Sequence, residues 1–316
     1  MSRRNRWFLH FAILALLLLA AWMFVDFAAL GTALRRAPLP TVAVLVVAYC
    51  LDRLAMALKW QPLLRAVGIH IPLREVVLIY FEASFVGRAL PTALGGDALR
   101  IYRVSKISGQ TAAVVSAAAV EKIAGIIAAA LIASFGAIWL ARDLAEAELH
   151  PLLIAVPGCA ALTVVLFGVS LSTKIGATLV GWLPGAAVRR AATKFLEAYQ
   201  AYRKKRGVIV SGIVYSLLEQ ALQVAILFFA ARAVGITAPT GVLVAVLAVS
   251  EFLRKIAIVL EGWGLATIVT VGVLALAGID ENEAFALAIL ATLIAWLAVL
   301  PGGLLLLRAR RSENED

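Results

Sequence analysis

The hydrophobic residues of this chain gather in long, almost uninterrupted stretches that short polar segments separate. A helix of roughly 20 apolar residues is long enough to cross the hydrocarbon core of a membrane, which is about 30 Å thick. Six stretches reach this length and predict full crossings: 7–30, 40–58, 111–140, 152–171, 207–234 and 282–307. The pattern therefore predicts an all-α integral membrane protein.

Two further apolar stretches, 73–106 and 240–279, are interrupted by charged residues such as Glu82, Arg88 and Glu251. Each also contains residues that break helices, namely Pro91, Gly95 and Gly96 in the first and Gly262 and Gly264 in the second. Backbone that leaves the helical form at membrane depth needs protein or a water-filled cavity to satisfy its hydrogen bonds. We therefore predict two broken or re-entrant hairpins with a cavity between them.

Basic residues are distributed unevenly among the segments that join these stretches. Of the 29 Lys and Arg, 20 fall on one side of the predicted topology, with Lys59 counted among them, 4 fall on the other side and 5 lie within apolar stretches. Short loops rich in Lys and Arg stay in the cytoplasm. The distribution predicts an integral protein of the plasma (inner) membrane with both termini in the cytoplasm.

With this orientation, the two halves of the chain repeat one order of elements in opposite directions. Each half has two spans, a hairpin and a further span, first from the inside and then from the outside. This order is typical of the inverted-topology repeats of secondary transporters. The prediction is a single polytopic membrane domain, 1–316, with a first repeat at 1–140 and a second at 141–316.

The segment 174–206, between the halves, carries too much charge to span a membrane. Its apolar residues recur at helical spacing opposite its basic ones, as in Phe195 and Tyr199 against Arg190 and Lys194. An amphipathic helix of this kind lies at the membrane surface and binds anionic headgroups. The alternative is a basic anchor that fixes the topology without recognising any lipid.

Composition supports the membrane interpretation and excludes other classes of protein. The chain is 63% hydrophobic and 15% charged with a mean hydropathy of +0.97, whereas soluble domains are about 45–50% apolar and about 25% charged. Such short loops leave no segment polar enough to fold as a separate soluble catalytic domain. We attribute the net charge of +10 to contact with anionic lipid, so no nucleic-acid partner is expected.

The sequence shows no grouping of metal or nucleotide ligands. Cys50 and Cys159 have no CxxC partner, and His10, His70 and His150 are scattered singly. A P-loop of the GxxxxGK[ST] type is also missing from the sequence. We expect no metal and no other cofactor, so any lipid movement would be passive, coupled to an ion or driven by a partner.

Ionisable residues at membrane depth are the strongest candidates for a site, because each such charge costs roughly 2.5–3.5 kcal/mol on insertion scales. We predict that a lipid path is lined by Arg88, Asp97, Arg100, Glu121, Lys122, Glu219 and Glu261. Two structural alternatives stay open. Asp97 follows the Gly-Gly turn and suits a helix N-cap, and Glu121 with Lys122 suits a structural pair with Arg88 or Glu82.

Three stretches resemble one known family. The sequence LPTALGGDALRIYRVSK, which ends at Lys106, resembles the PGG-x-GGD-x-x-R signature of the lysylphosphatidylglycerol synthase transmembrane-region family. Residues 120–123 with Gly125 resemble that family's acidic-basic pair in the next span. The stretch 261–264, followed by 282–307, resembles its second glycine motif and last helix.

The resemblance implies a flippase-like membrane domain that binds or translocates lipid. In some relatives this domain is fused to a soluble aminoacyl transferase, and here we expect a stand-alone member without it. The second motif departs from the family pattern at three positions. Thr267 stands in place of glutamate, Glu261 in place of proline and Thr292 in place of arginine, which moves our expectation for the site to the first hairpin.

These observations favour a lipid flippase or lipid transporter that moves a phospholipid, a polyprenyl-linked lipid or a triterpenoid. One alternative is a non-transporting membrane subunit that holds an enzyme of lipid or cell-envelope biosynthesis. A second is a membrane-embedded lipid transferase, which would need a nucleophile or general base with convergent partners. Ser84, Ser105 and Ser116 have no neighbouring histidine in the sequence, so we do not expect an enzyme.

The topology can be tested by labelling single cysteines. We expect both termini and 174–206 to be reachable from the cytoplasm, and His150 and Asp280 to be reachable from outside. A cysteine at Asp280 that reacts only from the cytoplasmic side would contradict the inverted repeat.

Overall fold

The computed structural model describes residues 31, 35–89, 94–143, 150–170, 172, 178, 180–182, 184–256 and 263–315. Within these ranges the regular elements are helices and no strand occurs. They are α3 (Leu39–Ala66), α4 (Leu73–Ala89), α5 (Leu94–Ser108), α6 (Thr111–Asp143), α7 (His150–Ser170), α9 (Ala186–Gln200), the 3₁₀ turn η2 (Ala201–Lys204), α10 (Arg206–Val234), α11 (Thr240–Ile256), α12 (Trp263–Leu276) and α13 (Glu281–Glu315). The predicted all-α fold class is confirmed.

Four of these helices are long and apolar enough to cross a membrane. The apolar segments are Leu39–Ala66, Thr111–Trp139, Arg206–Val234 and Glu281–Leu307, and they match four of the six predicted spans. A fifth, 152–171, corresponds to α7, a helix of 21 residues. The sixth, 7–30, lies outside the described residues.

Both interrupted stretches are pairs of shorter helices, as predicted. The first stretch forms α4 and α5, which pack against each other, and the second forms α11 and α12, which also pack together. Two of the predicted breakers, Pro91 and Gly262, lie outside the described residues. Gly95 and Gly96 lie in the first turn of α5, and Gly264 lies in the first turn of α12.

One glycine of the first hairpin is required by close packing. A Cβ atom on Gly96 would lie 2.5 Å from the carbonyl oxygen of Ala83, on α4. Only a residue without a side chain permits this approach. Gly96 thus allows α5 to pack directly against α4. Polar side chains of the two helices then lie close to one another.

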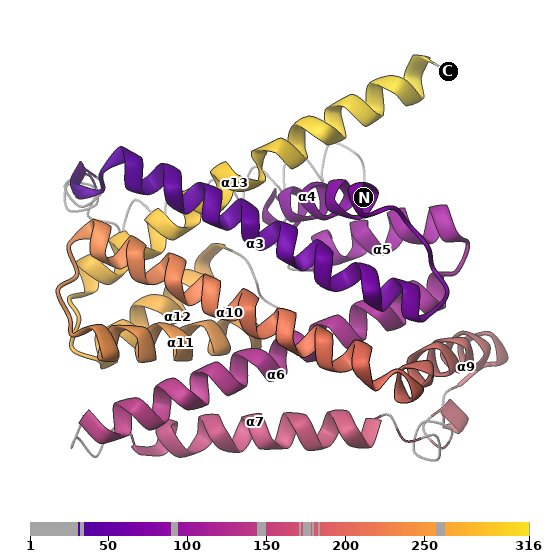
Figure 1. Ribbon diagram of the computed structural model, residues 1–316, viewed down its shortest axis with the longest axis horizontal. Helices are drawn as coiled ribbons and strands as arrows, with labels where there is room; N and C mark the ends of the chain where they lie inside the picture. The colour runs from indigo at the N-terminus through magenta and orange to yellow at the C-terminus, as the bar shows by residue number, and fades with distance from the viewer. Residues whose placement is uncertain are drawn as a thin grey trace.

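The long helices cross the molecule side by side (Figure 1). α10 packs along α3 and also contacts α6, while α7 packs along the other side of α6. α13 packs against α4 and α12. The buried apolar residues form one large cluster around α10, α11 and α13 and a second around α3, α4 and α6, so α3 and α10 meet in the middle of the protein.

One boundary differs from the prediction. The predicted span ended at residue 58, but α3 continues to Ala66 through Pro62. Lys59, which the sequence placed among the cytoplasmic loop residues, is therefore inside a helix and its side chain is only 3% exposed. We ended the predicted span before Lys59 because an unpaired lysine is normally found outside the membrane. The sequence alone does not show that this lysine has partners.

The basic segment between the halves forms the helix α9 and the 3₁₀ turn η2 over residues 186–204. α9 leads into η2, where the Tyr202 hydroxyl donates to the Leu63 carbonyl oxygen at 2.7 Å, at the end of α3. Tyr199 and Tyr202 are buried, but Val188, from the same predicted apolar face, is 51% exposed. The helix is therefore anchored to the protein by its C-terminal end, and its first turns stay exposed.

Candidate functional site

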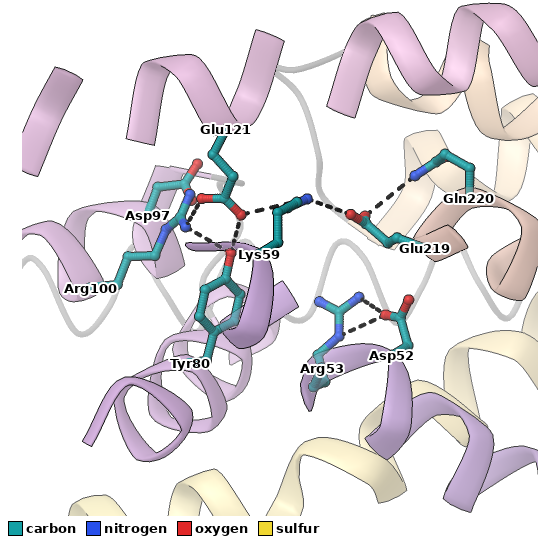
Figure 2. Close-up of polar contacts among 9 residues, drawn as sticks. All are labelled: Asp52, Arg53, Lys59, Tyr80, Asp97, Arg100, Glu121, Glu219 and Gln220. Carbon is teal, nitrogen blue, oxygen red and sulfur yellow. Dashed lines mark hydrogen bonds and ion pairs between the residues drawn. The ribbon is translucent and has the colours of Figure 1, made fainter. Parts of the chain in front are cut away.

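Charged side chains meet inside the protein where α3, α5, α6 and α10 come together. We call this group the ion network: Lys59, Tyr80, Asp97, Arg100, Glu121, Lys122 and Glu219. Figure 2 shows six of the seven side chains pointing toward one another from different helices. The network has three carboxylates and three cations, so its formal charge is balanced.

Glu121, on α6, is the centre of the network. Arg100 Nη1 donates to its Oε2 atom, the Tyr80 hydroxyl donates to its Oε1 atom, and Lys59 Nζ lies 3.7 Å from the same Oε1 atom. The Arg100 guanidinium also lies over two aromatic rings, 4.9 Å from the centroid of Trp60 and 5.2 Å from that of Tyr80. Arg100 is therefore held by an ion pair, by hydrogen bonds and by cation–π contacts with two rings.

Lys59 connects this centre to α10. Its Nζ atom donates to Glu219 Oε2 at 2.5 Å, and Gln220 Nε2 donates to the other oxygen of Glu219 at 3.3 Å. In Figure 2 the lysine lies between the two glutamates, with a contact to each. One side chain of α3 thus joins α6 to α10.

The network opens toward the surface at Asp97. Arg100 donates to Asp97 Oδ1 from Nε at 2.9 Å, and Lys122 Nζ donates to Asp97 Oδ2 at 2.8 Å. Side-chain exposure is 36% for Lys122 and 28% for Asp97, but 7% for Arg100 and 3% for Glu121. The polar side chains therefore run inward from a partly exposed mouth.

Polar residues continue along α3 beyond Lys59. Asp52 accepts a hydrogen bond from Gln223 Nε2 on α10 at 2.7 Å and from Arg53 Nε at 3.1 Å. One turn further along α3, the Tyr49 hydroxyl accepts a hydrogen bond from Arg88. At a rise of 1.5 Å per residue, the distance from Tyr49 to Lys59 is about 15 Å of helix, or half of the hydrocarbon thickness.

This interface also has hydrogen-bonding capacity left over. Among the described residues, the buried atoms Asp52 Oδ1, Ser216 Oγ and Gln220 Oε1 have no hydrogen-bond partner. Buried polar atoms are almost always satisfied by protein or by water. The described part of the α3–α10 interface thus has three buried polar atoms that could still form hydrogen bonds.

The structure brings together five of the seven predicted site residues. Asp97, Arg100, Glu121, Lys122 and Glu219 all belong to the ion network. Arg88 lies apart from them, at the Tyr49 end of the polar residues on α3. Glu261 lies outside the described residues.

The two structural alternatives can be compared with these contacts. Asp97 lies in the first turn of α5, and its carboxylate binds Arg100 and Lys122. Glu121 pairs with Arg100 and Lys59, and Lys122 pairs with Asp97. Arg88 donates to Tyr49, and Glu82 pairs with Arg103 at 3.2 Å.

Sequence reasoning missed Lys59, Tyr80 and Asp52. Asp52 and Lys59 are seven residues apart, two helical turns, and therefore share a face of α3. On α10, Ser216, Glu219, Gln220 and Gln223 follow the same periodicity. Two polar stripes in neighbouring apolar helices were the signal that could have shown the pairing.

The second hairpin has fewer described polar contacts. Ser250 Oγ on α11 lies 3.4 Å from Thr270 Oγ1 on α12. Glu251, the residue after Ser250, is buried. The Thr292 hydroxyl, at the position where the family pattern has arginine, donates to the Ala288 carbonyl oxygen of its own helix at 2.8 Å.

The Lys59–Glu219 pair gives a stability prediction. Lys59→Met leaves the Glu219 carboxylate buried without its cation and is expected to lower the free energy of unfolding by about 3–5 kcal/mol. Replacing both partners, in Lys59→Met/Glu219→Met, is expected to restore most of this loss, since no buried charge is stranded. Unfolding in mixed detergent micelles measures both, and a double variant as unstable as the single one would contradict the pairing.

Comparison with known proteins identifies one family. The family described as the lysylphosphatidylglycerol synthase TM region matches residues 7–303. No curated protein matches the chain closely enough to identify a relative. The family match covers nearly the whole chain, including every helix that contributes to the ion network. The chain therefore belongs to the lysylphosphatidylglycerol synthase transmembrane-region family.

Proposed function

We propose that this protein moves a lipid across the membrane and that the lipid headgroup passes along the ion network and the polar face of α3. The observation that carries the proposal is the set of buried, hydrogen-bonded charges inside helices that are otherwise apolar. Charged residues in membrane segments are rare and usually mark a path for a substrate or an ion.

The course of the polar residues supports the proposal. A headgroup meets the partly exposed Lys122 and Asp97 first, then Arg100, and then Lys59 between its two glutamates. Asp52, whose Oδ1 atom has no hydrogen-bond partner, follows, and Arg88 lies at the end. At each step, a charged or hydrogen-bonding side chain replaces the water that the headgroup has lost. The apolar acyl chains of the bilayer cannot form such contacts.

We further propose that the protein lies in the plasma (inner) membrane with both termini in the cytoplasm, and that the basic segment 174–206 binds anionic headgroups there. On α9, Arg189, Arg190 and Lys194 are exposed. A hollow of about 290 Å³ next to η2 is lined by Arg203 and Arg206 together with Gly168, Ser172 and Ile209. Burial raises the pKa of the Tyr202 phenol, which keeps the hydroxyl protonated as the donor that anchors this segment to α3.

Reconstituted protein is expected to speed the movement of a labelled lipid between leaflets without changing its covalent structure. Liposomes with labelled phospholipids, polyprenyl phosphates and triterpenoids, quenched from outside, measure the rate. The folded Lys59→Met/Glu219→Met variant is expected to lose most of this activity, since it removes polar groups from the path. A matched control, Arg74→Met/Glu281→Met, removes one cation and one anion that are exposed, and is expected to keep the activity.

Three results would overturn the proposal in different ways. Equal rates with and without protein for every lipid would favour the non-transporting subunit that holds a biosynthetic enzyme. A chemically altered lipid would show an enzyme. Full activity in the Lys59→Met/Glu219→Met variant would show that the ion network is structural and that lipid takes another route.

A further inference from the structure

The most exposed part of the ion network has the geometry of an anion site that the protein fills with its own carboxylate. Asp97 Oδ1 lies 2.9 Å from Arg100 Nε and 2.8 Å from Arg100 Nη2, and Asp97 Oδ2 lies 2.8 Å from Lys122 Nζ. One edge of a guanidinium and one ammonium thus contact the two oxygens of a single carboxylate. Arginine binds carboxylate and phosphate oxygens with the same fork of donors.

One donor of this site is held in place independently of Asp97. Arg100 is fixed by Glu121, by the Tyr80 hydroxyl at 2.7 Å and by the rings of Trp60 and Tyr80. The Lys122 side chain is 36% exposed and contacts Asp97 Oδ2. If the Asp97 side chain turns away, Arg100 keeps its position, and the three cations of the ion network are left with two carboxylates.

Asp97 is also the one acid of the ion network that is free to leave. Its side chain is 28% exposed, while the side chains of Glu121 and Glu219 are each 3% exposed. Water can hydrate an exposed charge when it separates from its partner, whereas a buried charge is left without either partner or water. Exchange of the Asp97 carboxylate for an anion from outside therefore needs no rearrangement of the buried charges.

We propose that Asp97 is a built-in substitute for phosphate, and that the substrate is a lipid whose headgroup contains a phosphate group. This inference rests on the proposed function and narrows its substrate class. The lipid phosphate takes the place of the Asp97 carboxylate on Arg100 and Lys122, and the returning carboxylate releases it. One anion replaces another, so the charge balance of the buried network is kept during the exchange.

The proposal predicts opposite effects on affinity and on rate. Asp97→Asn removes the internal competitor, so affinity for phosphate lipid is expected to rise about tenfold, while transbilayer movement slows because release needs the returning carboxylate. Lys122→Gln is expected to lower affinity about tenfold, and Lys122→Arg to restore it. The control Arg74→Gln removes an exposed charge at the start of α4 and is expected to change neither quantity.

The probes are labelled phosphatidylglycerol and labelled glucosylceramide, which has a neutral sugar headgroup without phosphate. Binding is measured in detergent micelles and movement in liposomes, each with the wild type and the four variants. The wild type is expected to bind and move phosphatidylglycerol at least about tenfold better than glucosylceramide. Inorganic phosphate, added alone, is expected to bind far more weakly than the phosphate lipid, because it lacks the acyl chains.

The possible results separate this inference from the proposed function. Equal movement of both lipids would overturn the phosphate inference and leave lipid transport standing. No movement of either lipid, with phosphatidylglycerol still bound more tightly by Asp97→Asn, would overturn transport and keep the phosphate site. Unchanged or lower affinity in Asp97→Asn would overturn the substitute role of Asp97, and inorganic phosphate binding as tightly as the lipid would show that the ligand is free phosphate.

Discussion

Lys59 bridges two buried glutamates on two different helices, and the rest of the polar interior depends on this bridge. A lysine, Glu121 and Glu219 are stable inside apolar helices only when each charge has a partner. Through Lys59, α3 fixes α6 and α10, and through Glu121 it fixes Arg100 and the α4–α5 hairpin. Such a network stabilises less than an apolar core of the same volume, so its presence calls for a function, and passage of a headgroup supplies one.

The fold was largely predictable from the sequence because the membrane imposes simple rules. A stretch such as 207–234 has the length and hydropathy of a span, and α10 covers Arg206–Val234. The first interrupted stretch forms two shorter helices, α4 and α5, as expected. The inverted relation of the two repeats stays a prediction, since it concerns direction across a membrane.

The site was predictable only in part, because its contacts join residues far apart in the chain. Asp97 and Arg100 could be paired from their spacing, and Glu121 stood out as a charge within a span. Its partner Lys59 did not stand out, because a lysine near the end of an apolar stretch is normally assigned to the cytoplasmic flank. Glu219 lies 160 residues from Lys59 in sequence, and Tyr80 has no charge to mark it. Their roles follow from how the helices pack.

The central claim is that a lipid headgroup contacts the ion network, and photo-cross-linking tests it most directly. The measurement uses wild-type protein in liposomes with phosphatidylglycerol that carries a diazirine in its headgroup, followed by mapping of the adducts by mass spectrometry. The account predicts adducts on peptides that contain Lys122, Tyr80 or Lys59. Adducts confined to exposed apolar side chains of the outer helices, such as Phe135 on α6 and Leu166 on α7, would contradict it.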